Sequence, residues 1–269
     1  MGKEINNIIF FGAGNIAQSV MLGLLDAGLS PKLVFAINKN PKNDAFLRKH
    51  AIKKIHSKDL ENFNQENNVL LLAVKPKDIN LAIDQLRLSG YRGIVCSLAA
   101  GIGLKKISSL LGSSLVVRAM PTTTAEFRLG TTAIYSDKPK AKKTKLIEKV
   151  FNLVGATLVL KVEKNMHDFT AIIGSGQAFI MQLLKEYETG LNNFSGKRNS
   201  KLIINSFLKS LSPQFEVYGF EKAIKKITSK KGTTEAGLAR LNNFGVNKIL
   251  KESFKSAKNR SKEIENEFK

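Results

Sequence analysis

The amino-acid sequence predicts an α/β fold in which a doubly wound, largely parallel sheet is followed by an all-helical part. Short apolar runs alternate with amphipathic stretches over roughly the first 160 residues, which is typical of successive β-α-β units. After about Glu163 the strand-like runs largely end, and long helical periodicities replace them. Two domains are expected of a chain of 269 residues, and the change of pattern places them at 1–162 and 163–269.

Strand-like runs are frequent in the first part. Several are apolar on both faces, as in residues 69–74, which is typical of a central strand that helices cover on both sides. We expect strands at 5–11, 32–38, 68–74, 93–98, 115–119, 131–136 and 156–162. The patterns between them predict helices at 16–27, 78–89 and 141–154.

Helical periodicity continues through the second part. We expect helices at 166–174, 178–192, 200–211, 215–228, 233–243 and 246–268. The last of them ends in a strongly polar run, so we expect its end to fray. Apolar faces at 172–184 and 202–211 are more extensive than one small sheet can cover. They predict that copies of the chain pair there, as a homodimer or a higher homo-oligomer.

The net charge is unusual, because 43 Lys and Arg residues against 22 Asp and Glu give +21. Such a balance permits binding to nucleic acid or to an anionic surface. The lysines are nevertheless spread along the whole chain, without an aromatic-interleaved basic stripe or a recognised nucleic-acid motif. Nucleic acid is therefore not expected as a partner. We interpret the lysines as a solvated surface whose field also attracts anionic substrates and cofactors.

Several classes of protein are excluded by what the sequence lacks. A single cysteine, Cys96, excludes a disulfide framework and a Cys-rich metal module. No cluster of His, Asp and Glu has metal-ligand spacing, so no metal is expected. His50, His56 and His167 are paired in the sequence with no nucleophile or carboxylate, and none is expected to be catalytic. No apolar run reaches the ~18 residues of a membrane helix, and the cytoplasm is the expected location.

Residues 12–17 read GAGNIA, a variant of the glycine fingerprint of dinucleotide sites, and they lie between the first predicted strand and the first predicted helix. The first glycine makes a tight turn, the second lets the backbone approach a pyrophosphate, and the final alanine permits close packing of helix on strand. The helix N-terminus adds N–H donors and a positive dipole end. This context predicts a Rossmann-type dinucleotide site formed by Gly12, Gly14, Asn15, Ile16 and Ala17.

The end of the second predicted strand indicates which dinucleotide binds. A site for NAD usually has an acidic residue there, which accepts hydrogen bonds from the ribose hydroxyls. In this chain no acid precedes Asp44, whereas Lys39 would attract a 2′-phosphate and Asn38 would hydrogen-bond it. We therefore expect NADPH, with NADH as the alternative cofactor.

Three further predicted strands end in small or polar residues, at 73–76, 97–101 and 118–124. Ligands of an open α/β sheet bind beyond the carboxyl ends of its strands. The three strand ends together predict one crevice, and the small residues at 97–101 leave room in it for a flat ring. The cofactor contacts expected there come from Ala73, Val74, Lys75, Pro76, Ala100 and Met120.

Two segments of the helical part, 174–178 and 228–235, interrupt the helical pattern. Ser175 is placed either to cap a helix or to bind a ligand. Thr233 or Thr234 would serve as an N-cap, which is the structural interpretation of the second segment. The functional interpretation is a helix N-terminus rich in hydroxyls and amides, which is suited to hold a small carboxylate.

Taken in order, these motifs resemble those of the pyrroline-5-carboxylate reductases: GxGNxA after a strand, AVKP, AAGI, RxMPxT, GSGxA with an aromatic residue, and TSxxGTT. The resemblance runs from about Ile8 to Leu241. It implies an N-terminal Rossmann domain and a helical C-terminal dimerisation domain. It also implies NAD(P)H-dependent reduction of 1-pyrroline-5-carboxylate to proline.

The resemblance further implies roles for individual residues. The substrate carboxylate would be held by the Ser229 side chain and by the amides of Gly232, Thr233 and Thr234. The Thr234 hydroxyl would hydrogen-bond the ring nitrogen and is the candidate catalytic group. Ser175 would approach the same crevice, from the same chain or from a second one.

Three motifs depart from the family pattern. Thr122 stands where MPNTP has Asn, and Gln177 stands where GSGPAY has Pro. In SPGGTT, Lys230 and Lys231 replace a Pro and a Gly, and the family's His-Pro pair upstream is not evident around 215–222. These departures leave open a reductase of a different cyclic imine. A non-catalytic NADP-binding or basic nucleic-acid-associated protein is the remaining alternative.

Overall fold

A computed structural model describes residues 5–64, 67–112 and 116–267. The chain forms two compact units, Met1–Gly174 together with Ala257–Lys269, and Ser175–Ser256. The division into domains at 1–162 and 163–269 stays a prediction, while the compact units themselves meet at Gly174 and Ser175.

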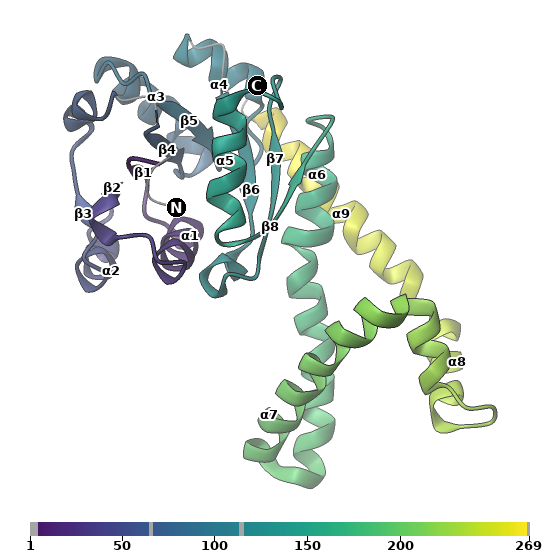
Figure 1. The fold of residues 1–269 in the computed structure, drawn as a ribbon. Coiled ribbons are helices and arrows are strands. Elements are labelled where there is room, and N and C mark those ends of the chain that lie inside the picture. The colour runs from purple at the N-terminus through teal and green to yellow at the C-terminus, as the bar shows by residue number, and fades with distance from the viewer. Residues whose placement is uncertain (1–4, 65–66, 113–115, 268–269) are drawn as a thin grey trace. The chain divides into compact units, whose positions relative to one another are not determined.

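The first unit contains a sheet of eight strands in the order β3-β2-β1-β4-β5-β6-β7-β8 (Figure 1). All neighbours are parallel except β6 and β7, which are antiparallel. The strands are β1 Ile8–Phe11, β2 Val34–Ile37, β3 Lys53–Lys54, β4 Val69–Leu72, β5 Ile94–Ser97, β6 Val116–Pro121, β7 Gly130–Tyr135 and β8 Gly155–Val159. A doubly wound α/β fold followed by a helical part is therefore confirmed.

The order of the strands reverses at β1. Ile8 pairs with Val34 of β2 on one side and with Val69 of β4 on the other. The chain thus winds outward in both directions from β1 and β4, and the crevice beyond their carboxyl ends is the expected place for a ligand.

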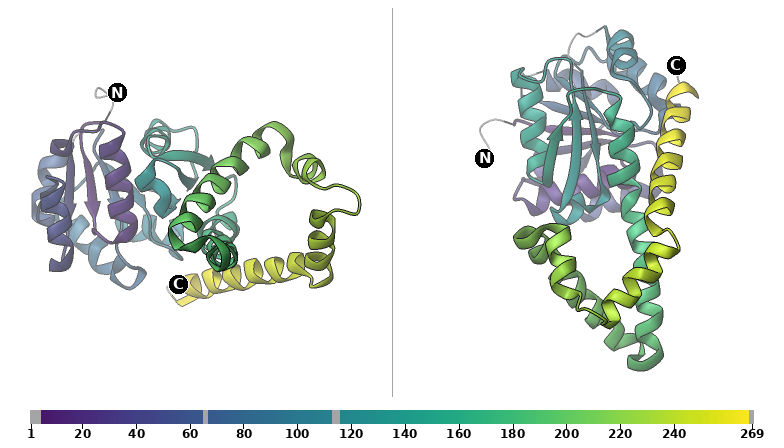
Figure 2. Two further views of the ribbon diagram at one scale, coloured as in Figure 1. Left: turned by 90° about the horizontal axis from the view of Figure 1, so that it is seen from below. Right: turned by 90° about the vertical axis from the view of Figure 1, so that its right-hand side faces the viewer.

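Helices cover both faces of this sheet (Figure 2). Alternate residues of β1 enter two separate cores, since Phe10 packs with the residues of α1 and α5 and Phe11 packs with those of α3. Burial on both faces explains why the central strands are apolar throughout. The helices of this unit are α1 Asn15–Asp26, α2 Asp44–Lys49, α3 Ile79–Leu88, α4 Leu104–Leu111, α5 Lys142–Asn152 and α6 Asn165–Phe169.

Short elements account for most differences from the prediction. The strand expected at 32–38 begins only at Val34, because Pro31–Leu33 forms a 3-10 turn that Ser30 caps. The sequence did not indicate α2, α4 or the two-residue β3, which are too short to show a clear periodicity. The strand expected at 115–119 and the helix expected at 246–268 each extend to a residue, Leu115 and Phe268, that lies outside the described residues.

The second unit is built from α7 (Gly176–Ile227), α8 (Thr233–Asn243) and the first part of α9 (Val246–Glu267). Gly196 and Gly219, with φ of 76° and 66°, interrupt α7. The sequence correctly predicts a break between 192 and 200. The break expected between 211 and 215 is wrong, because Pro213 lies within the helix and the chain turns at a glycine, which adopts positive φ without strain.

Many apolar side chains of this unit are exposed to solvent in the single chain. Within residues 175–256, all of which the structure describes, only Gly176 and Ser200 are buried. Among the exposed large side chains are Ile180, Met181, Leu202, Ile203, Phe207 and Leu211. Among the described helices, none has both the length and the apolar run that crossing a membrane requires.

Candidate functional site

The glycine turn after β1 needs its two glycines for different reasons. Gly12 has φ +108°, and a Cβ there would lie 2.6 Å from the carbonyl oxygen of Ala73, so a larger residue does not fit. Gly14 is the N-cap of α1 and is exposed, and a Cβ on it would meet nothing within 4 Å. Ala17 is fully buried against the sheet, as expected for close helix packing. Gly14 therefore leaves open space in front of the first N–H groups of α1.

A pocket of about 670 Å³ lies at this turn. It brings together most of the predicted cofactor residues, namely Gly12, Gly14, Asn15, Ile16, Asn38, Lys39, Ala73, Val74 and Lys75. Ala17, Pro76, Ala100 and Met120, which were predicted with them, are not part of its lining. The sequence did not indicate Asn40, Asn43 or Asp78, which also line the pocket, because short polar loops carry no periodic signal.

Asn38 holds the loop after β2 in shape. Its side-chain amide donates to the carbonyl oxygen of Asn40 at 2.7 Å and to Asp44 Oδ1 at 2.8 Å. The Lys54 ammonium and this amide, which both donate to Asp44, hold the pKa of its carboxyl below the ordinary value. Asp44 therefore stays ionised and paired, whereas Lys39 is exposed at the rim of the pocket.

The turn after β6 shows how one departure from the family pattern is accommodated. The Thr122 hydroxyl is buried, accepts the N–H of Thr131 at 2.9 Å, and lies 2.8 Å from the Thr124 hydroxyl. These bonds close the connection between the antiparallel strands β6 and β7. Thr122 thus has a structural role in this chain. Met120 is partly buried at the end of β6, against a small core that contains Met166.

In the second unit, the loop before α8 presents a helix N-terminus. Gly232 is the N-cap, so the structural role as N-cap falls to neither Thr233 nor Thr234. The N–H of Gly232 donates to the carbonyl oxygen of Ser229 at 3.0 Å. A Cβ at residue 232 would lie 2.2 Å from Ser229 Oγ, so glycine is needed for Ser229 to lie this close to the helix.

Lys231, which stands where the family has glycine, has a backbone conformation that favours glycine. Its φ is +58°, in the left-handed region that costs a residue with a Cβ about 1 kcal/mol or more. Its N–H donates to Glu235 Oε2 at 2.6 Å, which holds the turn in place. The loop thus holds Lys231 in a backbone conformation that glycine adopts without strain.

These bonds decide which donors of the loop remain for a ligand. The N–H groups of Lys231 and Gly232 are used within the loop. The N–H groups of Thr233 and Thr234 belong to the first turn of α8, where a helix offers no acceptor. In the part of the chain that the structure describes, neither threonine hydroxyl has a hydrogen-bond partner.

Ser175 is the N-cap of α7 but makes no side-chain cap hydrogen bond. It follows a π-helical turn, Thr170–Gly174, at the end of α6. Among the described residues, no hydrogen bond joins Ser175 to the loop 228–234, so its expected approach to the substrate crevice stays a prediction.

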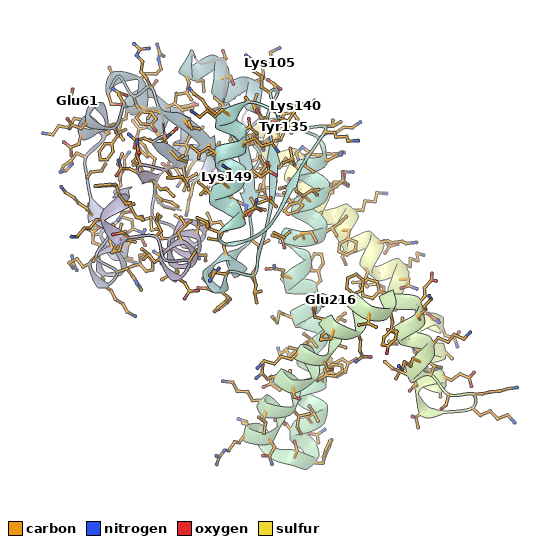
Figure 3. All side chains as sticks on the ribbon, viewed as in Figure 1. Glu61, Lys105, Tyr135, Lys140, Lys149 and Glu216 are labelled. Atoms are coloured by element: carbon orange, nitrogen blue, oxygen red, sulfur yellow. The ribbon has the colours of Figure 1, made fainter. Side chains whose placement is uncertain are left out.

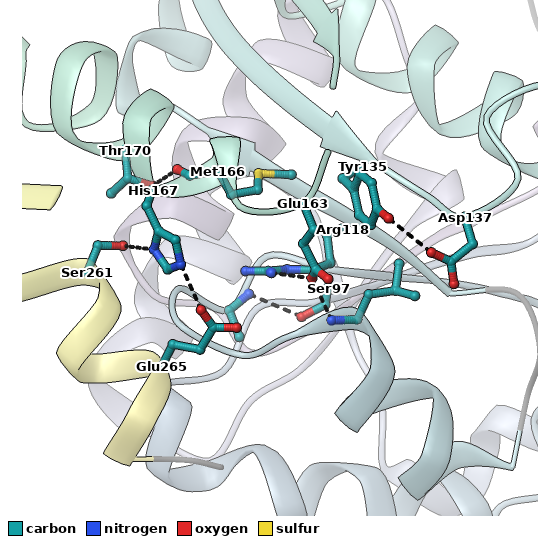
Figure 4. A network of polar contacts seen from close by, with 12 residues as sticks. Ser97, Arg118, Tyr135, Asp137, Glu163, Met166, His167, Thr170, Ser261 and Glu265 are labelled. Atoms are coloured by element: carbon teal, nitrogen blue, oxygen red, sulfur yellow. Dashed lines mark hydrogen bonds and ion pairs between the residues drawn. The ribbon is translucent and has the colours of Figure 1, made fainter. Parts of the chain in front are cut away.

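The interpretation of His167 from the sequence is wrong in one respect. Its Nε2 lies 2.7 Å from Glu265 Oε2 and its Nδ1 lies 2.9 Å from Ser261 Oγ, so it does have a carboxylate partner (Figure 4). No short motif could indicate this pair, because the partners are 98 residues apart. Among the described residues no group of His, Cys, Asp and Glu could hold a metal ion.

Comparison with known proteins agrees with this arrangement. Residues 163–264 match the family model for pyrroline-5-carboxylate reductase dimerisation, and residues 7–101 match that for coenzyme F420-dependent NADP oxidoreductases. Pyrroline-5-carboxylate reductase 1 of Bacillus subtilis (strain 168) is 31% identical over 267 residues, which cover 96% of this chain and 89% of that protein. The chain belongs to the pyrroline-5-carboxylate reductase family.

Other members of the pyrroline-5-carboxylate reductase family match over nearly their whole length. Pyrroline-5-carboxylate reductase 2 of Bacillus subtilis (strain 168) is 29% identical, covering 98% of this chain and 97% of that protein. The solved structure of the Plasmodium falciparum pyrroline carboxylate reductase with NADP bound matches with a TM-score of 0.85. The match covers 98% of this chain and 100% of the Plasmodium falciparum chain at 21% identity, so the two proteins share a fold.

Proposed function

We propose that this chain reduces 1-pyrroline-5-carboxylate to L-proline with NADPH, and that NADH is a possible second cofactor. The observation that carries the proposal is the similarity to named pyrroline-5-carboxylate reductases along nearly the whole of both chains, including 31% identity to one from Bacillus subtilis. The pocket beside Gly12 and Gly14 supports it, because it lies where an open α/β sheet binds its ligand.

The residues of the first unit fit a reduced dinucleotide. The open space at Gly14 and the first N–H groups of α1 would hold the pyrophosphate. Lys39 would attract the 2′-phosphate, and Asp44, the first acid after it in the sequence, is paired with Lys54. Val74 and Lys75 line the pocket, and Ala100 and Met120 are the proposed contacts towards the nicotinamide end. When bound, the nicotinamide supplies the hydride for the imine carbon.

The residues before α8 would hold the substrate. Its carboxylate would be bound by the N–H groups of Thr233 and Thr234 and by the Ser229 hydroxyl, with the positive end of the α8 dipole behind them. The amide of Gly232, expected from the sequence to help, already donates to Ser229 and instead shapes the loop.

In this proposal the main contribution of the protein to catalysis is to position the imine and the nicotinamide relative to each other. The Thr234 hydroxyl would hydrogen-bond the ring nitrogen, which becomes the proline amine. An imine that arrives protonated needs no dedicated general acid. Orientation of two reactants contributes about 7–11 kcal/mol to lowering a barrier, which is enough to make it the main catalytic effect.

A homodimer or a higher homo-oligomer is part of this proposal. The family model for the dimerisation domain matches residues 163–264, and the helices of the second unit bury almost none of their own side chains. A groove of about 890 Å³ along α7 is lined by Met181, Leu184, Leu202, Ile204 and Leu208, among others. A second copy would cover such a surface.

The location and the partners are also proposed. The single cysteine, Cys96, is buried and unpaired, which suits the reducing cytoplasm. The partner other than a second copy is the imine substrate, and nucleic acid is not proposed as one. Side chains that end in nitrogen project from both units (Figure 3), and the lysines are spread along the whole sequence.

The proposal is tested by mixing purified protein with NADPH and a set of cyclic imines. Oxidation of NADPH with the five-membered imine carboxylate, and proline as the product, is the expected result. Turnover of only a six-membered imine would identify a different substrate, which the replacements at Lys230 and Lys231 leave possible. No turnover of any imine would reject the proposal. Duplex binding that persists at physiological salt would then favour a nucleic-acid role.

A further inference from the structure

The end of the chain returns to the first unit and packs beside α6 (Figure 4). Ser261 and Glu265, one turn apart on α9, contact the two ring nitrogens of His167 at 2.9 and 2.7 Å. Both His167 and Ser261 are buried, and Lys258 forms a further ion pair with Asp168. This end of α9 was expected from its polar sequence to fray. Its polar residues are instead used in specific contacts.

The same turn of α9 packs closely against the loop that follows β5. Gly101 has φ +71°, and a Cβ there would lie 2.5 Å from Ile264 Cγ2 and 3.1 Å from the Glu265 nitrogen. At Gly103, a Cβ would lie 3.2 Å from Glu265 Oε1. The loop 99–104 therefore has no room to move towards α9 while His167 holds Glu265 in place.

A second anchor holds the other end of this loop. Glu163 Oε1 accepts the N–H of Leu104 at 2.6 Å and the Arg118 guanidinium at 2.5 Å. Arg118 is buried in β6 and pairs in register with Ser97 at the end of β5. A buried arginine keeps its charge and requires a partner, so this ion pair fixes Glu163, and Glu163 fixes the start of α4.

We propose that His167 and Glu163 are positioning residues for hydride transfer. Ser261, Ile264 and Glu265, here called the C-terminal clasp, together with Glu163, hold the loop 99–104 in a fixed conformation. The small residues at its start, Ala99 and Ala100, follow the carboxyl end of β5, the side of the sheet on which the proposed function places the nicotinamide ring. The ring nitrogens of His167 contact Ser261 and Glu265, so its effect on the loop would pass through Glu265. This inference rests on the proposed function.

The first test uses hydrogen–deuterium exchange of the cofactor-free protein. His167→Asn and Glu265→Gln should each raise amide exchange in the segment 99–104 about five- to tenfold, the equilibrium change that follows the loss of one hydrogen bond. Glu163→Gln should do the same at Leu104. Exchange in β1 and β2 should stay at the wild-type rate, which shows that the unit remains folded. Unchanged exchange in the loop of His167→Asn would overturn the proposal.

Arg260→Ala is the matched control. Arg260 lies in the same stretch of α9 but, among the described residues, pairs with Glu263 and Glu267 of its own helix alone. Its loss should leave exchange in the segment 99–104 within about twofold of the wild type, because an exposed ion pair contributes little. A rise equal to that of Glu265→Gln would show a general loosening of α9 and would also overturn the proposal.

Kinetics give the second test. His167→Asn and Glu265→Gln should lower kcat about tenfold or more, because a small misplacement of the reacting ring is costly, while the Kd of NADPH changes less than about twofold. The double variant should lose little more than either single variant. A rise in Kd at constant kcat would reject the positioning role. Loss of all imine reduction in the wild type would instead reject the proposed function, and the exchange experiment would still stand.

Discussion

At the scale of single residues, the two glycines of the turn after β1 differ in what a methyl group would meet. Gly12→Ala places a Cβ 2.6 Å from the Ala73 carbonyl oxygen at φ +108° and should lower the free energy of unfolding by about 2–4 kcal/mol. Gly14→Ala meets open space and has φ −75°, so it should unfold like the wild type. Thermal unfolding of the two variants checks this contrast.

The same two variants separate stability from cofactor binding. Gly14→Ala directs its methyl group into the space proposed for the pyrophosphate, and the Kd of NADPH should rise tenfold or more, about 1.4 kcal/mol. Wild-type NADPH affinity in Gly14→Ala would contradict the assignment of this pocket.

Lys39 is proposed to distinguish the cofactors by charge. Lys39→Glu replaces an attracting charge with a repelling one and should raise the KM for NADPH about tenfold more than the KM for NADH. Lys42→Glu is the control, because Lys42 lies three residues on, in the same loop, but does not line the pocket. An equal change with both cofactors would mean that Lys39 is an ordinary surface lysine.

At the scale of elements, the loop before α8 carries a lysine in a backbone conformation that glycine prefers. Lys231→Gly should remove this strain and raise the free energy of unfolding by about 0.5–1 kcal/mol, after allowance for the greater freedom of glycine in the unfolded chain. Lys230→Gly, at a residue without positive φ, should not be stabilising. Unfolding temperatures at one fixed protein concentration measure the difference. A lower unfolding temperature for Lys231→Gly than for Lys230→Gly would show that the backbone of Lys231 is not strained.

The elements also show what could be predicted from the sequence. Strongly apolar strands such as β4 and the glycine turn at Gly12 are local signals, and they predicted the sheet and most of the pocket. The second break in α7 was misplaced because proline is a common but not an obligatory helix breaker. The pairing of His167 with Glu265 depends on where α9 ends in space, and no pattern in either segment encodes it.

At the scale of the whole molecule, the exposed apolar faces of the second unit predict obligate association. Light scattering at micromolar concentration should give at least twice the mass of one chain, and stability should fall on dilution. Leu202→Asp, in the groove along α7, should dissociate the assembly, whereas Leu88→Asp, on an exposed position of α3, should not. An active, stable monomer would contradict the proposal.

The net charge is likewise a property of the whole molecule. A charge of +21 spread over both units creates a field that favours anionic molecules of any kind, and it does not by itself specify one. The specificity is proposed to come from the pocket beside Gly12 and Gly14 and from the loop before α8. The charge is therefore consistent with an anionic dinucleotide and an anionic imine, both of which the proposed function requires.

If this chain reduces 1-pyrroline-5-carboxylate at the N-terminus of α8 as proposed, the Thr234 hydroxyl contacts the reacting nitrogen, and the rates of Thr234 variants report on that contact. Thr234→Ala should lower kcat/KM for the imine about tenfold to a hundredfold, because a hydrogen bond to the reacting nitrogen is lost. Thr234→Ser keeps the hydroxyl and should retain most of the activity, and neither variant should change the Kd of NADPH. A kcat/KM of Thr234→Ala equal to that of the wild type, with proline still formed, would show that the imine is not reduced at this helix N-terminus.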